Sequence, residues 1–152
     1  MNTEKKYGKS KALALDTWTK LARASTVMSK KSEESIRSFG LTSAQFAVLE
    51  ALGHLGDMTV GTLCNKMLVT GGNMTLVLDN LEKRNLVERI INPNDRRALN
   101  ITLTSEGKNL FDEIFVKHAE NIEKTMSILS EDEQIEMGKL LKKLGLGIMK
   151  QK

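Results

Sequence analysis

Apolar residues recur at helical spacing along most of the chain and predict six helices. The first spans about residues 10–38, and its broad apolar face, with Leu15 and Trp18, suggests burial against more than one neighbour. The last two helices begin near Thr104 and at a capping box over residues 130–133. A chain of this size cannot easily bury such long terminal helices in one small core, so we expect them to pair with a second copy.

A compact middle segment lies between these terminal helices. A second helix begins at a capping box over residues 42–45 and ends at Gly56. Two short amphipathic helices follow, separated by a break at residues 69–72, a pattern typical of a helix-turn-helix. The residues predicted to face the core from the helix before the helix-turn-helix and from its second helix are Phe46, Val48, Leu49, Leu52, Leu55, Met74, Val77, Leu78 and Leu81.

The pattern then changes from helical spacing to a period of two. Residues 86–91 form one predicted strand, and Leu99, Ile101 and Leu103 alternate with polar residues in another. Residues 92–97 between them are charged and rich in turn formers. The fold class predicted is therefore mainly α with a small β-hairpin wing, a winged helix-turn-helix with long terminal dimerisation helices.

Composition and charge narrow the function classes. The length of 152 residues suits one ordinary domain, and the single cysteine, Cys64, cannot form an internal disulfide. We find neither a secretion signal nor an apolar run of about 20 residues, so a cytoplasmic protein is expected. The net charge is only +4, with nine Lys/Arg against four Asp/Glu in residues 1–40. Any DNA contact must therefore come from a few well-placed side chains and helix ends.

Three short motifs follow one another around the predicted hairpin. Residues 81–89 read LEKRNLVER, residues 92–98 read NPNDRRA and residues 103–107 read LTSEG. In this order and spacing they resemble the MarR family of transcriptional regulators, in which they end the recognition helix, form the wing tip and start the next helix. The resemblance covers about residues 10–150. Asn85 stands where the family usually has Gly, and Asn tolerates a left-handed helix end.

The resemblance implies an assembly and a set of partners. It implies a homodimer held together by residues 1–40 and 105–152, with residues 41–104 as the DNA-binding lobe. The implied partners are double-stranded DNA carrying a pseudo-palindromic operator and a small-molecule inducer, with no membrane partner and no cofactor. Many family members repress genes and release DNA when a small molecule binds or a cysteine is oxidised.

The recognition helix expected over residues 71–84 has an open face that we expect to read DNA. Gly71 and Leu76 stand where family members often carry basic residues, so readout should depend more on small polar groups. Asn73 suits adenine, while Thr75 and Leu76 suit the methyl group of thymine. The candidate contacts are Thr70 as the N-cap beside a phosphate, Gly72, Asn73, Thr75, Leu76 and Asn80, with Asp79 on the same face. The alternative is an ordinary solvated face.

The wing tip supplies the sharper DNA-binding hypothesis. An arginine on a thin hairpin fits the narrow minor groove, and Arg97 is the first candidate and Arg96 the second. Asp95 would orient an arginine through an ion pair. The alternative is a solvated charged turn, which contributes little. Weaker candidates for phosphate contact are Ser43, Gln45, Lys66 and Lys83.

The signal that would regulate DNA binding is inferred mainly by analogy with the family. The residues that would line an inducer pocket between the dimer helices and the DNA-binding lobe are Trp18, Phe46, Phe111, Phe115 and His118, and plain core packing is the alternative. Cys64 lies on an apolar stripe, which favours a small core residue over a redox sensor. His54, His118 and Cys64 have no metal-ligand spacing.

The two alternatives to a sequence-specific regulator are an enzyme and an architectural DNA-binding protein. The chain has no nucleophile–base set, phosphate-binding glycine loop or paired carboxylates at meaningful spacing, so we do not expect an enzyme. A sequence-indifferent architectural DNA-binding protein is the remaining alternative. The modest and uneven distribution of charge argues against it.

Overall fold

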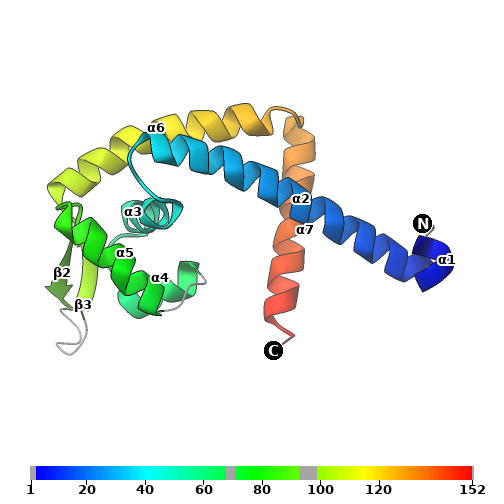
Figure 1. Ribbon diagram of the computed structural model, residues 1–152, viewed down its shortest axis with the longest axis horizontal. Helices are drawn as coiled ribbons and strands as arrows, with labels where there is room; N and C mark the ends of the chain where they lie inside the picture. Colours follow the sequence, from blue (N-terminus) through cyan, green and yellow to red (C-terminus); the bar gives the residue numbers. More distant parts are fainter. Residues whose placement is uncertain (1–2, 68–70, 93–98, 152) are drawn as a thin grey trace. The chain divides into compact units, whose positions relative to one another are not determined.

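The computed structural model describes residues 3–67, 71–92 and 99–151. The chain forms two compact units, Met1–His118 and Ala119–Lys152. The elements of the first unit, shown in Figure 1, are α1 (Thr3–Tyr7), α2 (Lys9–Ser38), α3 (Ser43–Leu55), β1 (Met58–Thr59), α4 (Val60–Met67), α5 (Gly71–Lys83), β2 (Val87–Ile91), β3 (Leu99–Leu103) and most of α6 (Ser105–Met126). The second unit holds the end of α6 and α7 (Glu131–Met149).

The predicted helices and the two predicted capping boxes are confirmed. The Thr42 hydroxyl accepts from the Gln45 N–H at 3.2 Å, while the Gln45 side-chain oxygen accepts from the Thr42 N–H at 2.9 Å. Ser130 and Glu133 form the same reciprocal pair at the start of α7. Each box satisfies two backbone N–H groups that a helix start leaves unpaired. Within the described residues, no helix has both the length and the apolar character needed to cross a bilayer.

A small antiparallel sheet forms the base of the wing. Its strand order is β1-β3-β2, with Val87 opposite Leu103 and Ile91 opposite Leu99 in the predicted hairpin. The sequence did not predict β1, because two residues are too few to show a period of two. Met58 on β1 pairs with Ile101 on β3, which ties the start of α4 to the hairpin.

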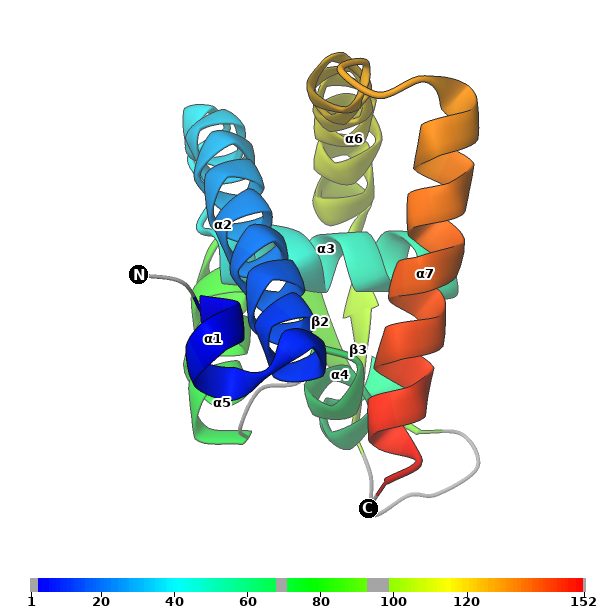
Figure 2. The same cartoon turned by 90° about the vertical axis from the view of Figure 1, so that its right-hand side faces the viewer.

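The core of the first unit lies where the helix-turn-helix meets the sheet. The side chains that are almost completely buried are Val48, Leu49, Leu63, Met74, Leu78, Leu81, Ile101 and Ile114. Figure 2 shows α3 lying across α4; β3 packs against both of these helices, and β2 packs against α5. One inward-facing prediction was wrong, because Leu55 is 59% exposed at the last turn of α3, next to the Gly56 cap. Val77 is only partly buried.

The motif LTSEG joins the sheet to α6 through one very close backbone approach. The Thr104 N–H donates to the Leu86 carbonyl oxygen at 3.2 Å, and the Thr104 hydroxyl accepts from the Gly107 N–H at 3.0 Å. A Cβ added at Gly107 would overlap the Leu86 carbonyl oxygen and lie 2.8 Å from its carbon. Only glycine therefore fits at this position.

The end of α5 is closed by an asparagine in a left-handed conformation. Asn85 has φ 56°, and the N–H groups of Asn85 and Leu86 donate to the carbonyl oxygens of Glu82 and Leu81. This pair of hydrogen bonds is a Schellman motif, which usually has glycine at the left-handed position. The cap therefore survives the replacement of Gly by Asn, as the sequence predicted.

Candidate nucleic-acid interface

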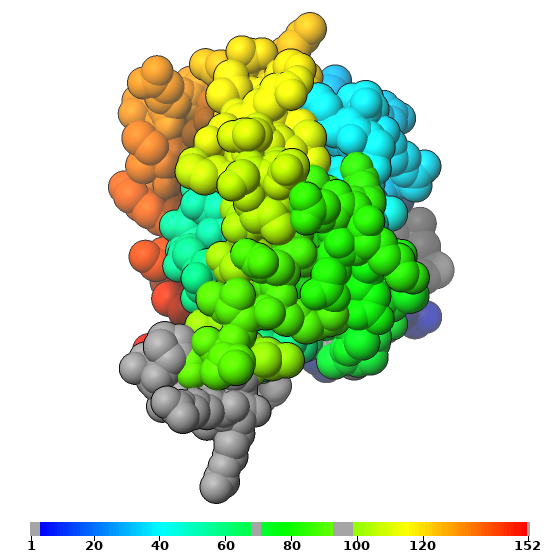
Figure 3. All heavy atoms as spheres, turned by 90° about the vertical axis from the view of Figure 1, so that its left-hand side faces the viewer, coloured from blue at the N-terminus to red at the C-terminus, as the bar shows by residue number. Residues whose placement is uncertain are grey.

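The first two turns of α5 present an uncharged, exposed face. Met74, Leu78 and Leu81 are buried on one side of this helix, which leaves the opposite side to solvent. The predicted contact residues described on the exposed side are Gly72, Asn73, Thr75, Leu76 and Asn80. Figure 3 shows α5 and β2 as one continuous green part of the surface.

The side chains on this face differ in how far they are engaged. The Thr75 hydroxyl donates to the Gly71 carbonyl oxygen at 3.1 Å, so its lone pairs remain available to a ligand. The side chains of Asn73 and Asn80 make no hydrogen bond to any residue that the structure describes. Leu76 is 65% exposed, while three other large apolar side chains of this helix are buried. The face therefore offers amide, hydroxyl and methyl groups together.

The side chain of Asp79 is less exposed than the sequence predicted. Its carboxylate accepts a hydrogen bond from the Arg89 guanidinium at 2.5 Å, and Glu82, one turn further along α5, contacts the same guanidinium. The hydrogen bond to Asp79, with the charges of Glu82 and Asp79, raises the pKa of Arg89 above its usual value despite partial burial. Arg89 is the last residue of the motif LEKRNLVER, but nothing in the sequence indicated its partners.

The weaker phosphate candidates lie elsewhere in the same unit. Ser43 and Gln45 are in the first turn of α3, where Ser43 contacts Glu33 at 3.4 Å and Gln45 is engaged in the capping box. Lys66 is exposed in the last turn of α4 and Lys83 in the last turn of α5. Four predicted contacts lie outside the described residues: Thr70, Asp95, Arg96 and Arg97.

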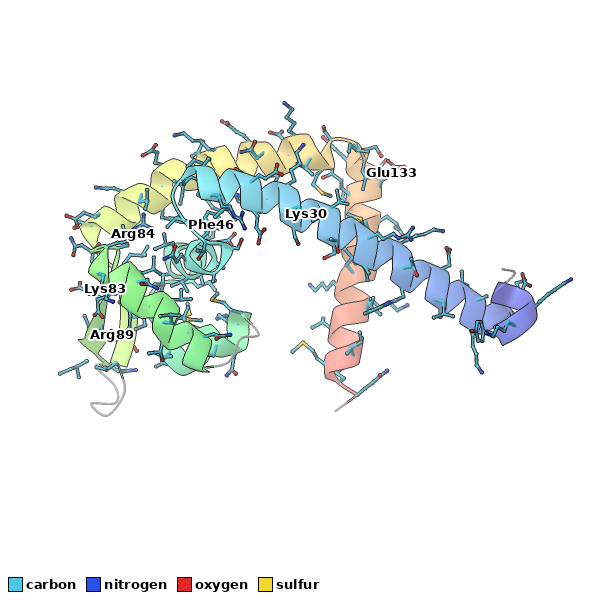
Figure 4. The ribbon with its side chains drawn as sticks, viewed as in Figure 1. Lys30, Phe46, Lys83, Arg84, Arg89 and Glu133 are labelled. Carbon is cyan, nitrogen blue, oxygen red and sulfur yellow. The ribbon has the colours of Figure 1, made fainter. Side chains whose placement is uncertain are left out.

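Four of the five predicted ligand-lining residues form one aromatic cluster between α3 and α6. Phe46 and His118 have ring centroids 4.6 Å apart, and Phe115 lies between His118 and Phe111 at 6.3 and 5.3 Å. Figure 4 labels Phe46 on α3, where its ring is buried. Trp18 on α2 makes no ring contact with a described residue and is 68% exposed.

The sequence missed one member of this cluster. His54 lies 4.4 Å from Phe115 and 5.1 Å from Phe111, both edge-on. His54 also lines an open groove between α3 and α4 with Ala47, Glu50, Ala51, Leu55, Lys66 and Met67. Its place about two helical turns beyond Phe46, at the next-to-last residue of α3, was the only signal that the sequence carried. The Nδ1 atom of His118 is buried and has no hydrogen-bond partner among the described residues.

Neither a metal site nor a cysteine site is built from the described residues. No three His, Cys, Asp or Glu side chains in residues 3–67, 71–92 and 99–151 gather at metal-binding positions. Cys64 is partly buried and packs against the hydrophobic core, as the interpretation as a small core residue predicted.

Comparison with known proteins identifies this arrangement. The family model "MarR family" matches residues 41–99. The transcriptional regulator MhqR from Bacillus subtilis is 36% identical over 126 residues, covering 83% of this chain and 87% of that protein. The chain belongs to the MarR family. The resemblance predicted from the three motifs is thereby confirmed.

Two solved structures of MarR-family regulators extend this assignment. A cysteine-to-serine mutant of MarR from E. coli, complexed with operator DNA, has TM-score 0.71 at 27% identity and covers 82% of this chain and 92% of its own. BpsR from Bordetella bronchiseptica, whose DNA binding is regulated by 6-hydroxynicotinic acid, has TM-score 0.75 at 28% identity and covers 86% of this chain and 98% of its own. The chain is thus a DNA-binding transcriptional regulator of a dimeric family, and the family is not one of enzymes.

Proposed function

We propose that this MarR-family regulator is a dimeric repressor that places α5 in the major groove of a pseudo-palindromic operator. The observation that carries the proposal is the exposed, uncharged face at the start of α5, opposite three buried apolar side chains. A helix of this diameter fits the major groove, where base edges offer a distinct pattern of donors and acceptors. The DNA-bound structure of MarR from E. coli supports the assignment of the lobe.

Each exposed group on α5 suits a particular part of the duplex. The free amide of Asn73 can pair with the N6 and N7 atoms of adenine, and the exposed Leu76 side chain can pack against a thymine methyl group. Gly72 allows close approach of the backbone, and Thr75 and Asn80 add polar contacts. The residues proposed to contact phosphate from neighbouring elements are Thr70, Ser43, Gln45 and Lys66.

The wing would reach the neighbouring minor groove. Strands β2 and β3 pair as far as Ile91 and Leu99, so the predicted wing-tip motif connects the ends of these two strands. We propose that Arg97, and secondarily Arg96, enters this groove while Asp95 orients an arginine. This assignment comes from the sequence motif, because these residues lie outside the described part of the chain.

The other parts of the chain have proposed roles in dimer formation and ligand response. Residues 41–104 would form the DNA-binding lobe, and residues 1–40 and 105–152 the dimer interface. An inducer would act near the aromatic cluster that links α3 to α6, which the ligand-regulated BpsR supports by analogy. A regulator of bacterial transcription works where the chromosome is, so we infer a cytoplasmic location.

Selection from a randomised duplex library tests the proposed function directly. We expect the wild-type protein to enrich a pseudo-palindrome whose half-sites are about 10 base pairs apart, with A·T pairs where Asn73 and Leu76 read them. Fluorescence anisotropy with the selected duplex and a shuffled duplex then measures the specificity ratio. Equal affinity for both duplexes would identify a sequence-indifferent architectural protein instead.

Arg97→Ala tests the wing assignment on the selected duplex. We expect binding to weaken by about 1–3 kcal/mol, because the variant loses a cation in a groove of concentrated negative potential. Arg96→Ala serves as the matched control, since it removes the same charge from the neighbouring position. A larger loss for Arg96→Ala would reverse the order of the two arginines, and no loss for either variant would refute the wing contact.

A further inference from the structure

Among the described residues, the two acidic residues of the recognition helix share one cationic partner. Asp79 and Glu82 are the two acidic residues of α5, and Lys83 is its one basic residue. Both carboxylates contact Arg89, which extends from β2 across to the helix. The side chain of Arg89 is 27% exposed, against 44% for Asp79 and 40% for Glu82. Figure 4 shows Arg89 on the strand and Lys83 and Arg84 at the nearby end of α5.

The net charge of these side chains determines whether this part of α5 attracts or repels DNA. The side chains of α5 alone carry one positive and two negative charges, a net charge of −1, and Arg89 brings the group to zero. Duplex DNA carries about one negative charge per 1.7 Å of its axis. Two uncompensated carboxylates in a groove lie within about one Debye length of several phosphates, so they would oppose binding.

We propose that Arg89 is a positioning residue that makes the second half of α5 compatible with DNA by offsetting, together with Lys83, the negative charges of Asp79 and Glu82. Arg89 acts through these two carboxylates and need not touch the duplex itself. The planar guanidinium suits this role, because its fork of donors serves two carboxylates at once. The inference depends on the proposed function, since the charge matters only if α5 enters a groove.

The same contacts also join the helix to the wing. Arg89 lies in the middle of β2, two residues before the strand ends at Ile91. Its two ion pairs therefore hold the base of the hairpin against the side of α5. A test of the proposal must separate charge neutralisation from this mechanical link, and the two acidic partners make that separation possible.

Arg89→Gln is the first variant of the test, measured by anisotropy on the duplex that the wild-type protein selects. We expect binding about tenfold weaker than wild type in about 0.05 M salt, and a deficit below about threefold in about 0.3 M salt, because salt screens the uncovered carboxylates. Arg89→Lys loses the fork of donors but keeps a positive charge beside both carboxylates, and because screening of the phosphates depends on that charge it should bind within about threefold of wild type. Circular dichroism verifies that each variant is folded.

The decisive variant removes both carboxylates together with the arginine. Asp79→Asn/Glu82→Gln/Arg89→Gln should bind at least as tightly as wild type, because no uncompensated acid remains near the phosphates. Arg84→Gln is the matched control: Arg84 donates to the Gly40 carbonyl oxygen at 2.9 Å and pairs with no acid in the described part of the chain, so losing its charge should cost less than about threefold.

Failure of the charge proposal and failure of the proposed function give different results. If the folded triple variant binds as weakly as Arg89→Gln, or if Arg89→Lys is equally weak, the arginine acts through geometry and the charge proposal is overturned. If Arg89→Gln binds like wild type, Arg89 has no role in DNA binding and the proposal is also overturned. If the wild-type protein itself selects no duplex, the proposed function fails and the inference falls with it.

Discussion

Gly107→Ala is expected to destabilise the DNA-binding lobe by about 3 kcal/mol or more, which is a large part of the stability of a domain this size. The added Cβ would overlap the Leu86 carbonyl oxygen, which is a backbone atom and cannot turn aside as a flexible side chain can. Relief would require α6 to move away from the sheet. That movement would break the hydrogen bond from the Thr104 N–H to Leu86.

Urea unfolding followed by circular dichroism measures this effect. Gly61→Ala is the matched control in the same lobe, because its new Cβ would make only an ordinary contact with the Thr59 hydroxyl at 3.9 Å. Gly61 lies in α4, where Ala favours the helix, so this control should be neutral or slightly stabilising. A Gly107→Ala protein as stable as the Gly61→Ala protein would contradict the close approach.

Features encoded by neighbouring residues were predictable from the sequence. Helix starts depend on side chains three residues apart, so both capping boxes could be located, and the left-handed end at Asn85 follows from the conformational tolerance of asparagine. The alternation of apolar and polar residues in 99–103 was sufficient to locate β3, although not to set its register with β2. The three motifs were sufficient to indicate the family.

Features that depend on distant residues were not predictable. The partners of Arg89 lie seven and ten positions away, on a different element, and become neighbours only when β2 packs beside α5. His54 joins the aromatic cluster because α3 lies against α6, and β1 exists because it pairs with β3. Asp79 could be placed on the correct helix face, but its ion pair depends on tertiary structure. Helical periodicity therefore located the elements, while the side-chain partners within the site required the structure.

The exposed apolar residues of α7 predict that this helix forms part of the dimer interface. None of its residues is buried in the single chain, although the helix carries a stripe formed by Met137, Leu140, Leu141, Leu144 and Ile148. Leu140, Leu144 and Ile148 also line a groove, with Lys143, Gly147 and Gln151. A 19-residue helix with this much exposed apolar surface needs a partner, and a dimeric family supplies one in a second copy of the chain.

Leu144→Glu should therefore dissociate the dimer. In a two-fold interface the change occurs twice, and each copy loses about 1.5–3 kcal/mol of apolar burial and adds the cost of desolvating a carboxylate. We expect the dimer dissociation constant to rise by more than about a thousandfold, equivalent to about 4 kcal/mol. Affinity for the selected duplex should fall more than about a hundredfold, because each monomer then holds one half-site.

Sedimentation velocity and anisotropy together measure these two losses. Lys142→Gln is the matched control, since it makes the same unit change in charge at a polar position of α7. This control should remain dimeric and bind DNA within about threefold of wild type, because it removes no apolar contact. A Leu144→Glu protein that stays folded and sediments as a dimer at micromolar concentration would show that α7 is covered by something other than its counterpart in a second copy. The long apolar face of α2, with Leu13, Trp18 and Val27 exposed, would then be the remaining candidate for the dimer interface.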